Sequence, residues 1–109
     1  MNNTVTQEQF NLILEQRLEK IRGVLGSKAK EYATTTDRMH NFNVAARIMD
    51  TTPEKALWGI FMKHLVSVID LVDGVDATVN MVDEKMGDMI NYMILLEAML
   101  KNGRGTEGT

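Results

Sequence analysis

The chain of 109 residues contains no cysteine and only one proline. Without thiols it cannot form a disulfide scaffold, use a thiolate as a nucleophile, or build a zinc or iron–sulfur site on sulfur ligands. Because proline is nearly absent and alternation of apolar with polar residues is rare, long helices are favoured over strands. The sequence therefore predicts an all-α protein.

Long apolar runs and an excess of basic charge are also missing. No segment approaches the roughly 18 uninterrupted apolar residues of a spanning helix, and the polar start MNNTVTQEQF lacks the cationic and apolar regions of a signal peptide. Lysine and arginine number 12 against 15 acidic residues, for a net charge of −3. The composition therefore provides no excess of basic charge for binding a nucleic-acid backbone. We expect a cytoplasmic protein that binds neither a membrane nor a nucleic acid.

The composition that remains is that of a folded domain, with 44% hydrophobic and 25% charged residues. The length allows a single domain over 1–101, followed by a polar, glycine-rich tail over 102–109 that should be disordered. A chain of this size buries only somewhat more than about 60% of its unfolded surface, so a subunit interface would help it. We expect a bundle of about four helices, completed by oligomerisation to a homodimer or tetramer.

Capping residues predict where the first two helices begin. Thr6 and Gln9 have the spacing of a capping box, and the helix that follows should run to about residue 33. Asp37 is a suitable cap for a short second helix. One face of the first helix should be apolar, through Phe10, Ile13, Leu14, Leu18, Ile21, Leu25 and Tyr32.

The third and fourth helices are marked more clearly. A threonine cap before Pro53 starts a helix over 53–73, and Gly74 can take the left-handed conformation that ends it. Asn80 is a cap for a last helix over 81–101. The main apolar face of this last helix should consist of Val82, Met86, Met89, Met93, Leu96 and Leu100.

The third helix carries unusual polar residues. His64 falls inside its broad apolar arc, while Lys63, Ser67 and Asp70 form a narrow polar stripe at i, i+4 and i+7. Because the helix should be central, we expect the stripe to face a cavity. The alternatives are a core histidine satisfied by a backbone carbonyl and a solvated edge for Lys63 and Asp70.

A second polar stripe lies on the last helix. Glu84, Asp88 and Asn91 follow at i, i+4 and i+7, and Leu95 continues the line, which indicates a face turned toward protein. Two carboxylates there repel each other, and a divalent cation such as Mg²⁺ or Mn²⁺ relieves the repulsion. The alternative is a solvated helix face, since acidic residues four apart are common.

A charged pair occurs on the first helix as well. Lys28 falls in the middle of its apolar face and Glu31 at the edge of that face. Charged groups on a core-facing stripe require a partner, which is either a ligand or a structural salt bridge.

Three blocks, taken together, resemble a known family. They are Lys28-Ala29-Lys30-Glu31-Tyr32 with Asp37-Arg38 and Asn41-Phe42; Ala56-Leu57-Trp58-Gly59 with Lys63-His64, Ser67 and Asp70; and Glu84-Lys85-Met86-Gly87-Asp88 with Asn91-Tyr92. The chain resembles small phage-encoded nucleotide modification associated proteins, which look like distant members of the MazG-like all-α nucleoside triphosphate pyrophosphatases. The resemblance covers about residues 28–100 and would place the protein in the host cytoplasm.

The resemblance implies an oligomeric helical bundle that hydrolyses a nucleoside triphosphate to the monophosphate and pyrophosphate with magnesium. Glu84 and Asp88 match the final acidic pair of that family. On the facing helix the family carries two glutamates three apart, whereas this chain has Lys63, His64 and Asp70, of which Asp70 is the obvious metal ligand. The metal site implied is Glu84, Asp88 and Asp70.

The chemistry of the residues in these blocks suggests further roles as hypotheses. Lys28, Arg38 or Lys63 would bind phosphate oxygens, and His64 would act as a general base or as a hydrogen-bond donor to phosphate. Phe42 or Tyr92 would stack on a base, and Asn41 or Asn91 would bind its edge. Lys63 and Glu84 would serve catalysis together with His64, and Glu31 and Tyr32 would line the substrate site.

Two other functions stay open at the level of sequence. The absence of the glutamate pair favours a module that binds or sequesters a nucleotide without cutting it, for example against a host defence. A structural or regulatory helical oligomer without a small-molecule site is the third possibility, and it requires Glu84, Asp88 and Asp70 to lie on solvent.

Overall fold

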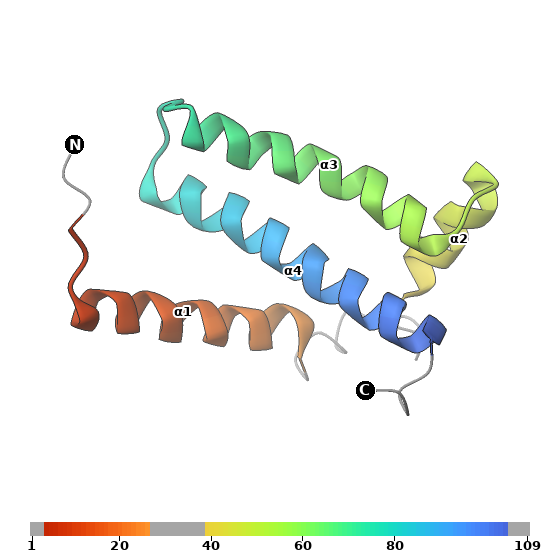
Figure 1. The fold of residues 1–109 in the computed structure, drawn as a ribbon, viewed down its shortest axis with the longest axis horizontal. Helices are drawn as coiled ribbons and strands as arrows, with labels where there is room; N and C mark the ends of the chain where they lie inside the picture. Colours follow the sequence, from red (N-terminus) through yellow and green to blue (C-terminus); the bar gives the residue numbers. More distant parts are fainter. Residues whose placement is uncertain (1–3, 27–38, 105–109) are drawn as a thin grey trace. The chain divides into compact units, whose positions relative to one another are not determined.

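A computed structural model describes residues 4–26 and 39–104 of the chain. These residues form four α-helices and no strand: α1 (Gln7–Leu25), α2 (His40–Met49), α3 (Pro53–Val72) and α4 (Val79–Arg104) (Figure 1). The expectation of an all-α protein is therefore confirmed. The chain divides into two compact units, residues 1–34 and 35–109, and each is described by itself.

The first unit contains α1, which begins at the predicted capping box. The Thr6 hydroxyl accepts a hydrogen bond from the Gln9 amide at 3.1 Å, and the Gln9 side chain accepts one from the Thr6 amide at 2.9 Å. The helix ends at Leu25 rather than near residue 33. The amide of Gly26 caps the Arg22 carbonyl, and a Cβ at Gly26 would overlap that carbonyl, so the close approach needs glycine.

The apolar face of α1 is not covered within its own unit, where no residue of the helix is buried. Phe10, Ile13 and Leu14 are exposed, while Leu18, Ile21 and Leu25 are only partly buried. The expected continuation of this face to Tyr32 lies outside the described residues.

The second unit begins with α2. Its first helical residue is His40, with Met39 at the N-cap and no side-chain cap. The predicted cap Asp37 lies outside the described residues. The helix ends at Asp50, whose backbone adopts the left-handed conformation and donates to the carbonyls of Ala46 and Arg47. This sharp stop allows α3 to start three residues later.

Helix α3 has the predicted bounds almost to the residue. The Thr52 hydroxyl accepts from the Lys55 amide at 3.2 Å and Pro53 occupies the first turn. Gly74 follows the helix with a φ of 92°, a conformation that side chains with a Cβ rarely adopt. The chain therefore turns at the predicted position.

Helix α4 begins and ends differently from the prediction. The Thr78 hydroxyl accepts from the Met81 amide at 3.1 Å, so the helix starts at Val79 and Asn80 is not its cap. At the other end it continues to Arg104, whose guanidinium donates to the Leu100 carbonyl at 3.3 Å. The tail predicted as disordered over 102–109 is thus helical through Arg104, and residues 105–109 lie outside the described residues.

The core of this unit lies around α3, which runs alongside α4 and also contacts α2 (Figure 1). Its centre is Leu57, Phe61 and Met99, all buried. Partly buried apolar side chains from all three helices surround it, namely Met39, Phe42, Leu65, Met89, Tyr92, Leu95 and Leu96. The central position expected for the third helix is confirmed.

The apolar face predicted for the last helix is correct only in part. Met89 and Leu96 pack against the core as predicted, whereas Val82, Met93 and Leu100 are exposed. The core is also filled from Tyr92, Leu95 and Met99. These three, with Leu96, follow at i, i+3, i+4 and i+7, which is one side of a helix. Because α4 has apolar residues on more than one side, periodicity alone did not decide which side meets α3. None of the described helices is long and apolar enough to cross a membrane.

Candidate functional site

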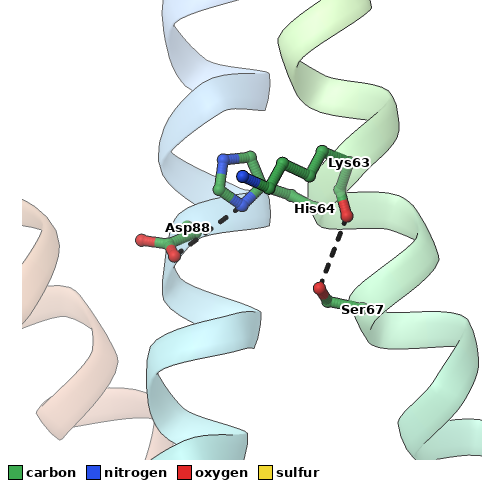
Figure 2. Close-up of polar contacts among 4 residues, drawn as sticks. All are labelled: Lys63, His64, Ser67 and Asp88. Atoms are coloured by element: carbon green, nitrogen blue, oxygen red, sulfur yellow. Dashed lines mark hydrogen bonds and ion pairs between the residues drawn. The ribbon is translucent and has the colours of Figure 1, made fainter.

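His64 of α3 and Asp88 of α4 face each other across the helix pair (Figure 2). The distance from His64 Nδ1 to the nearer Asp88 carboxylate oxygen is 3.7 Å, which suits an ion pair to a protonated imidazole and is longer than a hydrogen bond. The imidazole is mostly buried and the carboxylate is mostly exposed. The second oxygen of Asp88 points away from His64 and is left for another ligand (Figure 2).

Aromatic stacking holds the imidazole from a second direction. The ring of Tyr92, one turn along α4 from Asp88, stacks on His64 with a centroid distance of 4.8 Å and an interplanar angle of 25°. Phe42 of α2 meets Tyr92 edge to face at 6.1 Å. Tyr92 thus holds the imidazole of His64 at the margin of the core, and Phe42 in turn packs against Tyr92.

The orientation of α4 also brings Asn91 inward. Its Oδ1 atom is buried and has no hydrogen-bond partner. A buried amide oxygen without a donor costs about 1–3 kcal/mol unless a water or a ligand satisfies it. Asn91 lies three residues after Asp88, so the unsatisfied acceptor belongs to the same part of α4 as the ion pair.

The polar stripe of α3 lies apart from these contacts. Lys63 and Asp70 are exposed and Ser67 is partly buried. The hydroxyl of Ser67 donates to the Lys63 carbonyl within α3 at 3.4 Å (Figure 2), which is a common way for serine to be satisfied inside a helix. Among the polar residues of this part of α3, His64 is therefore the one whose described contacts reach α4.

Glu84 is exposed one turn before Asp88 on α4. The two carboxylates share the same side of the helix at i, i+4, where like charges repel. Asp70 lies six residues beyond His64 along α3, which is about 9 Å of helical rise from the level of Asp88. In residues 4–26 and 39–104 no group of three or more His, Asp or Glu side chains has a metal-binding arrangement.

The carboxylates that are present nevertheless fit one kind of ion. Mg²⁺ is usually held by one or two carboxylates together with waters and substrate phosphates, rather than by a complete protein cage. Asp88, with its outer oxygen free of His64, and Glu84, one turn away, supply such a pair. Asp70 is separated from them by its level on α3.

The remaining candidates are placed as follows. Lys28, Glu31, Tyr32 and Arg38 lie outside the described residues. Asn41 is exposed in the first turn of α2, one residue before Phe42, whose ring is partly buried against Tyr92. Of the thirteen residues that the sequence singled out, the structure thus brings four into contact or adjacency around one point: Phe42, His64, Asp88 and Tyr92.

The chain matched none of the protein families, curated proteins or solved structures with which it was compared.

Proposed function

We propose that the chain is a magnesium-dependent nucleoside triphosphate pyrophosphohydrolase that works as a homo-oligomer. The observation that carries the proposal is the contact of His64 with Asp88 and Tyr92 between α3 and α4. It joins a histidine and a carboxylate of two sequence blocks that resemble the MazG-like enzymes. The chain carries a net charge of −3, so a cation that accompanies a small anionic substrate reduces the repulsion between the two.

Two features of the pair suit it for proton transfer. Asp88 lies beside Nδ1, so Nε2 is the ring nitrogen left to take a proton, and the carboxylate stabilises the imidazolium that results. Tyr92 restricts rotation of the imidazole by stacking on its face. A base held in one orientation is the arrangement that hydrolysis by an activated water requires.

The proposed reaction breaks the bond between the α-phosphorus and the oxygen that bridges to the β-phosphate. A water oxygen forms the new bond to the α-phosphorus, its proton passes to Nε2 of His64, and the electron pair of the broken bond leaves with pyrophosphate. Magnesium, when bound by Asp88 and Glu84, supplies neutralisation of phosphate charge and lowers the pKa of water. Lys63, exposed on the turn that carries His64, is the described cation nearest in sequence for a phosphate oxygen.

The test is a panel of ribo- and deoxyribonucleoside triphosphates assayed for pyrophosphate and monophosphate with Mg²⁺ and with a chelator. We expect turnover of some member that stops with the chelator, and a loss of about 100-fold or more in His64→Gln and Asp88→Asn. The matched control is Glu97→Gln on the same helix. Glu97 lies away from the site, and its carboxylate is paired with the Lys101 ammonium at 2.7 Å. An inactive panel with metal, or equal activity in the Asp88 and Glu97 variants, contradicts the proposal.

A nucleotide-binding module that does not cut its ligand is the second candidate. It is favoured by the buried, unpartnered oxygen of Asn91 and by the rings of Phe42 and Tyr92, which are groups that bind rather than cleave. It predicts that a nucleotide raises the melting temperature, that Asn91→Leu abolishes this rise, and that the ligand is recovered intact. If no nucleotide raises the melting temperature and none is hydrolysed, both nucleotide functions are excluded and the structural oligomer remains.

A further inference from the structure

Helix α3 carries a second apolar surface that the rest of its own unit, α2 and α4, leaves exposed. Its members, named here the outer stripe, are Trp58, Met62, Val66 and Ile69, which are 48%, 41%, 55% and 47% exposed. They follow at i, i+4, i+8 and i+11 and so share one side of the helix over about 16 Å. This side differs from the one that places Leu57 and Phe61 in the core.

Trp58 is held in place before any partner arrives. Its indole stacks on the buried ring of Phe61 with centroids 5.2 Å apart and planes at 23°. An exposed tryptophan that is already ordered loses little side-chain entropy on binding, which is the property of residues that dominate interfaces. Gly59 adjoins the stripe, and a Cβ there would meet nothing within 4 Å, so another backbone can approach closely at this point.

The outer stripe is flanked by opposite charges at its two ends. Lys55 at one end and Asp73 at the other are eighteen residues apart, about five full turns, and therefore lie on the same line of the helix. Lys55 and Asp73 are equally far from position 64, and so are Met62 and Val66, while Trp58 and Ile69 differ in distance from it by one residue. An identical helix laid antiparallel would pair Trp58 with Ile69, Met62 with Val66 and Lys55 with Asp73, each twice.

The area of the outer stripe also suits a copy of itself. The four exposed fractions correspond to roughly 350 Å² of apolar surface per chain, taking side-chain areas of about 150–250 Å². A standard interface buries about 800 Å² per partner, of which about 57% is apolar, or roughly 450 Å². The stripe therefore supplies most of the apolar area that a stable dimer needs.

We propose that the outer stripe is a self-association surface, on which a second copy of this chain docks with its α3 antiparallel about a two-fold axis near position 64. The occupant is identified by complementarity, since Lys55 meets Asp73 at both ends and the apolar pairs fill the middle. The proposed interface rests on the proposed function for the expectation of a homo-oligomer and says which face forms it. The experiments below measure association and not turnover, so a failure of the interface is distinguishable from a failure of the hydrolase activity.

The first test places a charge in the centre of the stripe. Sedimentation equilibrium of the full chain over a concentration series should show a dimer, and Met62→Glu and Val66→Glu should each raise its dissociation constant by about 100-fold or more, because every substitution occurs twice. The matched control is Ile48→Glu on α2, where the side chain is 80% exposed and outside the stripe. Circular dichroism checks that all three variants remain helical.

The second test addresses the antiparallel pairing. Lys55→Glu or Asp73→Lys alone puts like charges together at both ends and should weaken the dimer by about 3-fold to 10-fold at low salt. The double variant exchanges the charges and should restore the dissociation constant to within about 2-fold. A double variant as weak as the two single effects combined overturns the arrangement.

Fluorescence emission of Trp58, the only tryptophan of the chain, tests whether something other than a second copy covers the outer stripe. In the proposed dimer its emission shifts to shorter wavelength as concentration rises, in step with mass. A concentration-independent monomer with emission already blue-shifted means that the protein's own chain covers the stripe. A dimer unaffected by Val66→Glu means that another face associates. Either result overturns the proposal.

Discussion

Replacing Tyr92 by alanine should destabilise the α2–α4 unit strongly, because this one ring contacts two other helices. It stacks on His64 of α3 and receives the edge of Phe42 of α2. Each aromatic pair contributes about 0.5–1.5 kcal/mol beyond the area that it buries. Truncating a large aromatic side chain in a core costs about 3–5 kcal/mol. Since Tyr92 is only partly buried, about 3 kcal/mol is expected.

The corresponding fall in melting temperature is about 15 °C, taking about 4–8 °C per kcal/mol for a domain of this size. Thermal unfolding followed by circular dichroism at 222 nm measures it. Tyr92→Phe keeps both ring contacts and should shift the midpoint by less than about 5 °C. Met93→Ala, at the next and exposed position of α4, is the matched control and should stay within about 0.5 kcal/mol of the parent.

The reasoning is refuted if Tyr92→Ala melts within a few degrees of Met93→Ala. The ring would then contribute no more than an exposed side chain, and His64 would not be fixed by stacking. A fall of equal size in Tyr92→Phe and Tyr92→Ala would assign the stability to the hydroxyl instead, for which no hydrogen bond is seen among the described contacts. Both outcomes are read from the same set of curves.

Two further changes test the fold. Leu57→Ala removes a side chain with no exposed surface and should lower the free energy of unfolding by about 2–5 kcal/mol. Urea denaturation measures this loss, and the slope of the transition should not change. A loss below about 1 kcal/mol would mean that the core around α3 closes over the cavity. Thr78→Ala should cost about 1 kcal/mol through loss of the cap of α4, whereas Asn80→Ala should be nearly neutral, and the opposite order would return the cap to Asn80.

Helix starts could be predicted where a single capping signal stands alone. The Thr6 capping box and the threonine before Pro53 are such cases, and both are observed. Before α4 two capable residues lie close together, Thr78 and Asn80. The structure uses the earlier one, since a helix that starts there gains hydrogen bonds for residues that would otherwise need water. The local sequence does not show which of the two residues caps the helix.

The rotation of α4 could not be predicted from periodicity for a related reason. Methionines and leucines lie on several sides of this helix, and any of these sides could meet α3. The choice depends on shape at the contact, where Met99 and Tyr92 enter the core and Met93 does not. Ring stacking of Tyr92 on His64 needs the two helices to pair at one level, and this is a property of the pair rather than of either segment.

The contact between His64 and Asp88 follows from the hairpin formed by the third and fourth helices. His64 lies nine residues before the end cap Asp73, and Asp88 lies ten residues after the start cap Thr78. In antiparallel helices, positions equally far from the connection lie at the same level. The observed caps therefore set the level of the pair, and the rotation of α4 decides that the two side chains meet.

His64 was open to two interpretations, a satisfied core histidine or a functional group, and its partner helps to separate them. A histidine kept for packing needs only one acceptor, which a backbone carbonyl provides. Here Nδ1 faces a mostly exposed carboxylate and the ring is clamped by Tyr92. An exposed ion pair adds little to stability, with a median near 0–1 kcal/mol. Stability thus explains the stacking of His64 on Tyr92 but gives little reason for Asp88, whose carboxylate is the part of the arrangement that the proposed chemistry uses.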